Sequence, residues 1–128
     1  MKISVSSYSF QQYIRAGKLS QLDTVKAAYD LGLRAIEFID LCPEQGKAPT
    51  LEEQKEYAKL IRAEADKYGM DINAYTIGAN LFKKGEDAEK IVEHYINAVA
   101  VSCHAEGVVS FESFDVFLTF RYVSVAAD

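Results

Sequence analysis

The fold is decided by one stretch of the sequence, Gly32-Leu33-Arg34-Ala35-Ile36-Glu37-Phe38-Ile39-Asp40. Gly32 suits the left-handed position just past the end of a helix, because glycine lacks the Cβ atom that makes this conformation costly. The residues from Ala35 to Ile39 form the short apolar run expected of a strand that is covered on both faces. Only Glu37 interrupts this run. A carboxylate in a buried strand is costly unless it is paired or faces a polar cavity, so Glu37 is the first candidate functional residue.

On both sides of this stretch, strand-like and helix-like segments alternate. Short β-prone runs at residues 2–6 and 71–77 predict two more strands. Apolar residues at helical spacing predict helices over 20–31, over 50–68 and from about residue 86. The last of these helices is expected to bury one apolar face, made of Ile91, Val92, Tyr95, Ile96 and Val99.

The predicted units repeat at a nearly constant spacing. Gly32, Gly69 and Gly107 each follow a predicted helix, at intervals of 37 and 38 residues, which is about the length of one strand–loop–helix–loop unit. The same register predicts a fourth strand over 108–111 and places Glu112 where Glu37 falls in its own unit. Strands that alternate with amphipathic helices indicate an α/β fold with a parallel sheet and right-handed crossovers. Ligands of such sheets bind beyond the C-terminal ends of the strands.

After Glu112 the alternation of strands and helices breaks. Residues 114–125 are aromatic or β-branched almost throughout, and they predict strand where a fourth helix is expected. We therefore divide the single domain, residues 1–128, into βα units over 1–112 and an atypical strand-like tail over 113–128. Two explanations stay open: the chain is a truncated or altered piece of a longer protein, or the tail pairs with a partner chain at an open sheet edge.

Composition and charge narrow the class of protein. The chain is 49% hydrophobic and 26% charged, which is typical of one globular domain, and its net charge of −5 argues against a nucleic-acid partner. We find no segment long and apolar enough to cross a bilayer and no leader pattern, so a cytoplasmic protein without a membrane partner is expected. Cys42 and Cys103 lie far apart, without metal-binding spacing, and are expected as free thiols.

Four segments together resemble the N-terminal part of the sugar phosphate isomerase/epimerase family. They run over residues 2–10, 27–33, 35–38 and 68–72, and the resemblance as a whole spans residues 1–96. The family has the xylose isomerase-like TIM barrel, so the resemblance implies a partial, truncated barrel with its active site at the C-terminal ends of the strands. It also implies a role in carbohydrate metabolism, a divalent metal that orients sugar oxygens, and acidic residues that move a proton between neighbouring carbons.

The resemblance carries over to three positions of this sequence. Glu37 matches a carboxylate that lines the family's pocket and is expected to be catalytic, and Tyr8 and Tyr75 fall at strand ends that would bind substrate. The family's metal ligands come mainly from later strands, so no metal ligand is assigned here. The expected ligand is a small sugar or sugar phosphate, and truncation is expected to impair the activity.

Several of the same residues have plain structural explanations. Glu37 could pair with Arg34, Asp40 fits a loop or capping residue, and His94 fits the surface of a helix. His104 lies near other possible metal ligands, but such spacing arises often by chance.

Two functions therefore stay open at this point. One is a metal-assisted isomerase or epimerase, and the other is a non-catalytic binding or assembly module that dimerises through open sheet edges. A homo-oligomer is expected, because a half-barrel exposes two edges that a second copy could cover. A flavodoxin-like domain is a third interpretation, but no glycine-rich phosphate loop follows the first strand.

Overall fold

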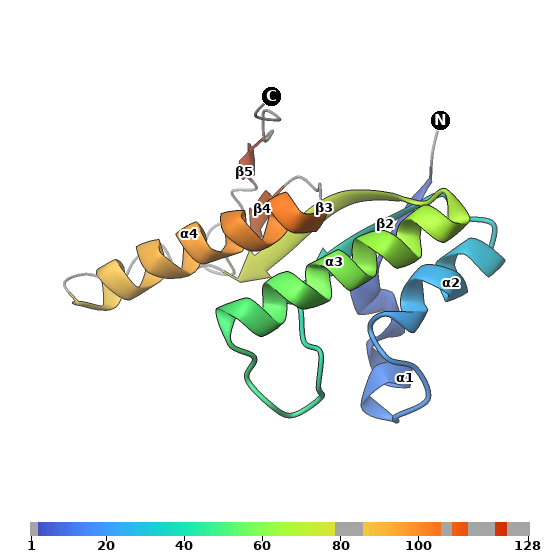
Figure 1. The fold of residues 1–128 in the computed structure, drawn as a ribbon, viewed down its shortest axis with the longest axis horizontal. Coiled ribbons are helices and arrows are strands. Elements are labelled where there is room, and N and C mark those ends of the chain that lie inside the picture. Colours follow the sequence, from blue (N-terminus) through green and yellow to red (C-terminus); the bar gives the residue numbers. More distant parts are fainter. Residues whose placement is uncertain (1–2, 79–85, 106–108, 113–119, 123–128) are drawn as a thin grey trace.

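Strands and helices alternate along the chain in the order that the sequence predicts (Figure 1). The computed structural model describes residues 3–78, 86–105, 109–112 and 120–122. Its elements are β1 (Ser4–Ser6), the 3-10 helix η1 (Ser7–Phe10), α1 (Gln11–Arg15), α2 (Asp23–Asp30), β2 (Ala35–Ile39), α3 (Leu51–Tyr68), β3 (Asp71–Gly78), α4 (Glu86–Ala105), β4 (Val109–Glu112) and β5 (Phe120–Tyr122).

The strands form one mixed sheet in the order β1-β2-β3-β4-β5. The first four strands are parallel, which confirms the predicted parallel sheet, and β4 at 109–112 confirms the fourth strand predicted over 108–111. β5 lies in the atypical tail and pairs antiparallel with β4 of the same chain. The sheet is open, since β1 and β5 lie at its two edges. A flavodoxin-like sheet places its first strand between its second and third, so this order argues against that interpretation.

The three longer helices pack on one face of the sheet (Figure 1). Side chains alternate along β2, so that Ile36 and Phe38 face the helices while Glu37 faces the opposite side. One apolar cluster joins these two residues to α2, α3, α4 and β3 through Val25, Ala28, Tyr57, Ala58, Ile61, Ala65, Ile72, Tyr75, Ile77, Ala98 and Val101. A single continuous core therefore holds the described part of the chain together.

The ends of the helices follow the signals in the sequence. At the start of α3 the Thr50 side chain accepts a hydrogen bond from the Glu53 amide at 3.2 Å, and Glu53 in turn accepts from the Thr50 amide at 2.7 Å. α3 ends at Gly69, which adopts φ +60° in the left-handed region. Gly32 adopts φ +84° after α2, as predicted, whereas Gly107 lies outside the described residues.

The predicted apolar face of α4 is wrong for two of its residues. Val92 and Ile96 are 55% and 62% exposed, whereas Ala98 and Val101 are buried in the core. The helix exists as predicted, and Ala98 and Val101 are its residues in the described core, whereas the side chains of Ile91, Tyr95 and Val99 lie outside the described residues. None of the helices within the described ranges combines the length and the apolar character that a membrane span requires.

Two neighbouring residues of α3 test this core. Ile61 is fully buried and Leu60 is 56% exposed. We expect Ile61→Val to lower the free energy of unfolding by about 1 kcal/mol, because it deletes one buried methylene. Leu60→Ala should change it by less than about 0.5 kcal/mol, although it removes more atoms. Urea unfolding followed by circular dichroism measures both values, and a larger loss for Leu60→Ala would contradict the assigned helix orientation.

Candidate functional site

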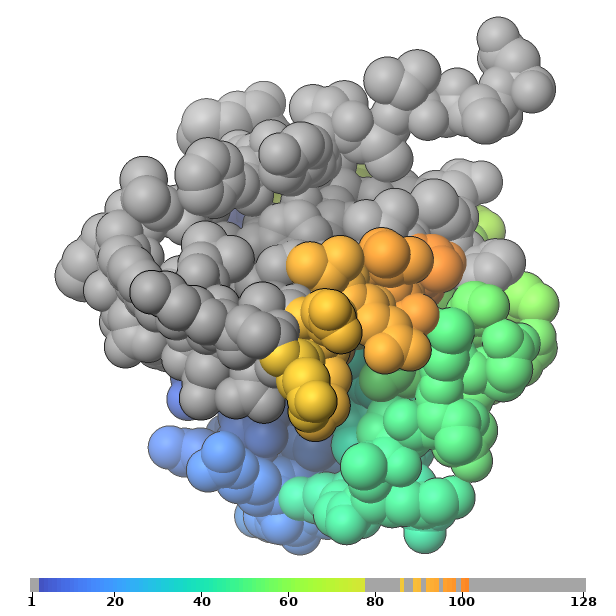
Figure 2. All heavy atoms as spheres, turned by 90° about the vertical axis from the view of Figure 1, so that its left-hand side faces the viewer, coloured from blue at the N-terminus to red at the C-terminus, as the bar shows by residue number. Residues whose placement is uncertain are grey.

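A concave feature lies where β1 and β2 end. It is a cavity of about 350 Å³, within the range of small-molecule sites. Its walls come from η1, α1, the turn before α2, the end of β2 and the loop that follows β2. The lining residues are Ser7, Tyr8, Gln11, Ile14, Gln21, Ile39, Asp40, Cys42, Gln45 and Gly46. Figure 2 shows this end of the molecule, with the blue N-terminal segment beside the green residues that lead into α3 and the orange α4 above them. The cavity is therefore at the C-terminal ends of the parallel strands, as the sequence predicts for a ligand site.

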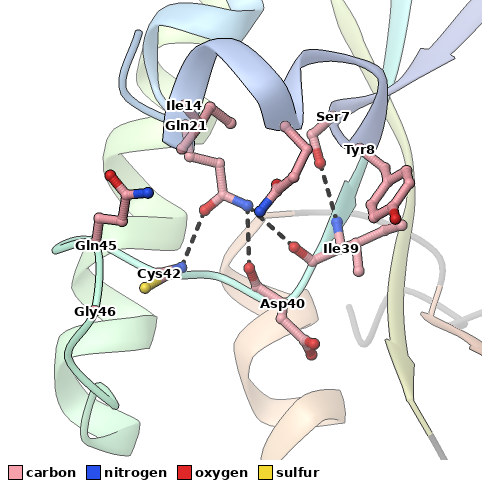
Figure 3. Close-up of a pocket in the computed structure, with 10 residues that line it drawn as sticks. Ser7, Tyr8, Ile14, Gln21, Ile39, Asp40, Cys42, Gln45 and Gly46 are labelled. Carbon is pink, nitrogen blue, oxygen red and sulfur yellow. Dashed lines mark hydrogen bonds between the residues drawn. The ribbon is translucent and has the colours of Figure 1, made fainter. Parts of the chain in front are cut away.

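Gln21 holds the turn that follows β2 (Figure 3). Its amide nitrogen donates hydrogen bonds to the carbonyl oxygens of Ile39 and Asp40, each at 3.0 Å, and its amide oxygen accepts one from the Cys42 amide at 3.0 Å. The side chain is largely buried. Because three backbone groups at a strand end need partners once they leave the sheet, this one amide fixes the course of the chain at the cavity.

Gln21 is itself held in place by the helices. The Leu22 amide donates a hydrogen bond to the Tyr57 hydroxyl of α3 at 3.0 Å, and the Thr24 hydroxyl donates to the Gln21 carbonyl at 2.6 Å. Burial raises the pKa of Tyr57, so its phenol stays protonated over the ordinary pH range. The Gln21 amide therefore projects from a rigid corner between α2 and α3.

Asp40 has the most unusual backbone conformation in this region. Its φ is +37°, which is uncommon for a residue other than glycine, and its amide donates to the Thr76 carbonyl of β3 at 3.1 Å. The residue is exposed, yet surrounding protein atoms desolvate its carboxylate and raise its pKa, while the charge of His94 acts in the opposite direction. A strained residue with a raised carboxylate pKa in a cavity is a candidate for proton transfer.

Ser7 and Tyr8 form the wall of the cavity on the β1 side. The buried Ser7 hydroxyl accepts a hydrogen bond from the Ile39 amide at 3.2 Å and so joins the end of β1 to the end of β2. Tyr8 is 63% exposed at the edge of the cavity, where its hydroxyl is available to a ligand. The Tyr8 placement agrees with its predicted position at a pocket, but its binding role stays a prediction.

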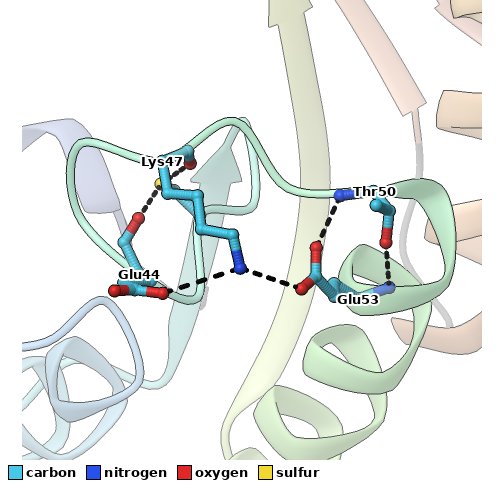
Figure 4. Close-up of polar contacts among 5 residues, drawn as sticks. Glu44, Lys47, Thr50 and Glu53 are labelled. Carbon is cyan, nitrogen blue, oxygen red and sulfur yellow. Dashed lines mark hydrogen bonds and ion pairs between the residues drawn. The ribbon is translucent and has the colours of Figure 1, made fainter.

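The loop between β2 and α3 is held by ion pairs (Figure 4). Lys47 Nζ lies 3.2 Å from Glu53 Oε1 and 3.7 Å from Glu44 Oε2, and these carboxylates raise the pKa of Lys47. Within the same loop the Cys42 thiol donates to the Glu44 carbonyl at 3.1 Å. The loop that borders the cavity is thus tied both to itself and to the start of α3.

The structure does not bring the three predicted site residues together. Glu37 is half-buried and accepts a hydrogen bond from the Thr76 hydroxyl at 2.6 Å, rather than lining the cavity with Tyr8. Tyr75 is buried in the core, where its hydroxyl accepts from the Leu41 amide at 3.5 Å and burial raises its pKa to about 12. Arg34, the alternative partner of Glu37, lies 4.7 Å from the centre of the Tyr29 ring.

In the described part of the chain, no group of three or more His, Cys, Asp and Glu side chains gathers where it could hold an ion. Cys42 is a free thiol, and the side chain of His104 lies outside the described residues. Ser7, Gln21 and Asp40 line the same cavity, where Ser7 and Gln21 hold the end of β2 and Asp40 supplies a carboxylate.

Replacing Gln21 tests whether it holds the strand end. We expect Gln21→Ala to lower the free energy of unfolding by about 1–3 kcal/mol, because the backbone groups that it satisfies lose their partners. Amide NMR shifts should change most at Cys42, whose N–H is released. Gln45→Ala is the matched control, since Gln45 is an exposed glutamine of the same cavity and should leave both measurements nearly unchanged.

The backbone strain at Asp40 can be measured directly. We expect Asp40→Gly to unfold with a free energy about 1 kcal/mol higher than Asp40→Ala, because alanine has a Cβ atom that clashes at positive φ. At the exposed helical position Ala63 the order should reverse, with glycine less stable than alanine by about 1 kcal/mol. Equal stability of the two Asp40 variants would mean that the left-handed conformation is not kept in solution.

Comparisons with known proteins leave the function to be argued from this geometry. No protein-family model matches the chain, and no curated protein matches it. The arrangement itself combines a strained carboxylate, a buried amide that positions it, and a cavity of small-molecule size at the ends of parallel strands.

Proposed function

We propose that this chain binds a small sugar or sugar phosphate at the ends of β1 and β2 and acts on it as an isomerase or epimerase. The observation that carries the proposal is Asp40, a carboxylate held at positive φ beside a cavity of small-molecule size. A general base for a carbon acid works best when its pKa lies close to the working pH, and partial desolvation moves Asp40 in that direction.

The topology supports a partial barrel of the TIM type. Sequential parallel strands with all crossover helices on one face are the building plan of a (β/α)₈ barrel, and the described sheet follows this plan from β1 to β4. In such barrels the ligand site lies at the C-terminal ends of the strands, where the Asp40 cavity is found. This agreement is one of architecture, and the sugar chemistry remains our inference.

The residues of the cavity divide into two roles under this proposal. Gln21 uses both ends of its amide on the backbone, so it is a positioning residue for Asp40. Tyr8 and Gln45 line the opening and would hydrogen-bond the hydroxyl groups of the ligand. Asp40 would remove a proton from the carbon next to the ligand carbonyl, and the enediolate so formed would take a proton back at a neighbouring or the same carbon.

Glu37 remains a second candidate for the base. Its carboxylate accepts from the Thr76 hydroxyl on the sheet face away from the helices, which corresponds to the interior in a closed barrel. A ligand bound on that face would meet Glu37 and not Asp40. Asp40 and Glu37 are therefore alternative candidates for the catalytic base, and substitution of each residue in turn distinguishes between them.

A non-catalytic module that dimerises is the other function we consider. The observation that favours it is the open sheet, whose β1 edge is flanked by the exposed apolar side chain of Ile3. Light scattering over a dilution series tests it. A dimer that persists at low concentration would support this alternative, and a monomer at all concentrations would exclude it.

Hydrogen–deuterium exchange at a sugar carbon tests the enzymatic proposal. The full chain is incubated in D₂O with D-xylose, D-fructose or D-fructose 6-phosphate, with and without Mg²⁺ or Mn²⁺, and proton NMR follows the C–H next to the carbonyl. We expect one sugar to lose this signal with the wild-type chain, and Asp40→Asn to slow the loss at least tenfold, as removal of a general base does.

Two variants act as controls in this experiment. Glu37→Gln should leave the exchange rate nearly unchanged, and a larger loss from Glu37→Gln than from Asp40→Asn would move the base to Glu37. Asp30→Asn removes an exposed carboxylate at the end of α2, away from the cavity, and should have no effect. Exchange that does not depend on the protein would refute the enzymatic proposal for these sugars.

A further inference from the structure

A second cavity lies on the other side of Asp40. It has a volume of about 490 Å³ and is bordered by the β2–α3 loop, the first turn of α3 and the exposed face of α4. Its lining combines apolar loop residues with Asp40, Lys47, Gln54 and His94. The first cavity is walled by segments around β1 and α2, so the second adds surfaces from a different part of the chain.

The two cavities are neighbours across a shared wall. Asp40, Cys42 and Gly46 line both of them. In Figure 3 the Asp40 carboxylate points away from Gln21 and toward α4, the helix that carries His94. Asp40 and His94 also interact electrostatically, since the charge of His94 stabilises the ionised form of the carboxylate. Asp40 thus lines both cavities, and its carboxylate is directed toward the α4 side, where the second cavity lies.

We propose that the ligand site continues past Asp40 into this second cavity, where Asp40 and His94 together bind one oxygen of a small polyhydroxylated carbonyl compound. This inference rests on the proposed function and assigns His94 as a second ligand-binding residue. A carboxylate accepts a hydrogen bond, and the N–H of an imidazole donates one. A sugar hydroxyl both donates and accepts, so it complements this pair.

The charges around the second cavity are consistent with this ligand class. The titratable groups that line it are Asp40, Cys42, Lys47 and His94, and Tyr75 lies behind Leu41 in the core. Lys47 is paired with Glu44 and Glu53 at 3.7 and 3.2 Å, which balances its charge. The Asp40–His94 pair therefore offers a charged acceptor and a donor to a hydroxyl group, beside the Gln54 amide of the same wall.

Amide NMR of the ¹⁵N-labelled full chain tests this extension with D-xylose, D-fructose and D-fructose 6-phosphate as probes. We expect shifts at Ser7 and the Gln21 side chain, which report the first cavity, and also at Ala48 and Gln54, which report the second. His94→Ala should weaken binding at least fivefold and remove the shifts at Ala48 and Gln54. His94→Gln should recover part of the affinity, because an amide keeps both a donor and an acceptor.

Lys90→Ala is the matched control, because Lys90 is an exposed residue of the same helix that does not line this cavity. It should leave the affinity unchanged. The extension would be overturned if a probe shifts only the resonances of Ser7 and Gln21 and its affinity is unchanged by His94→Ala. This result would leave the proposed function standing. If none of the three probes shifts the resonances of residues in either cavity, both the extension of the site and the proposed function are refuted for this ligand class.

Discussion

The parallel pairing of β2 with β1 and β3 is the constraint on which the rest of the described structure depends. Parallel neighbours cannot be joined by a tight turn, so each connection must cross over the sheet, and here the crossovers contain α2 and α3. Ile36 and Phe38 bury the helix-facing side of β2 against them. The same pairing brings the ends of β1 and β2 to one edge, and the cavity forms there.

A parallel strand that ends inside the protein leaves backbone groups without ladder partners. At the end of β2 these groups belong to Ile39, Asp40 and Cys42, and the Gln21 amide satisfies three of them. A buried backbone group without a partner costs about 1–3 kcal/mol, which is comparable to the cost of holding Asp40 at positive φ. The glutamine therefore stabilises a strand end whose conformation would otherwise be unfavourable, and the strained carboxylate is kept beside the cavity.

The sequence predicts local structure here better than it predicts the site. Helix caps predict the helix ends correctly, because these signals act over a few residues, and the repeat of the strand–helix unit predicts the fourth strand. The exposure of Val92 and Ile96 was not predictable from the apolar spacing of α4, since which of its side chains are buried depends on how the helix packs against the rest of the fold. The β5 pairing also depends on tertiary contacts, although the strand character of the tail was visible in its composition.

The site residues show why sequence position alone was insufficient. The family resemblance implied that Tyr75 faces a pocket, but the structure places its ring in the core, on the same side of the sheet as its β2 neighbour Phe38. Gln21 carried no signal, because its role depends on a contact with a strand end 18 residues later. Asp40 was visible as the residue that ends β2, but its positive φ was not. A glycine there would fit the backbone at lower cost, so the turn holds a carboxylate beside the cavity at the expense of backbone strain.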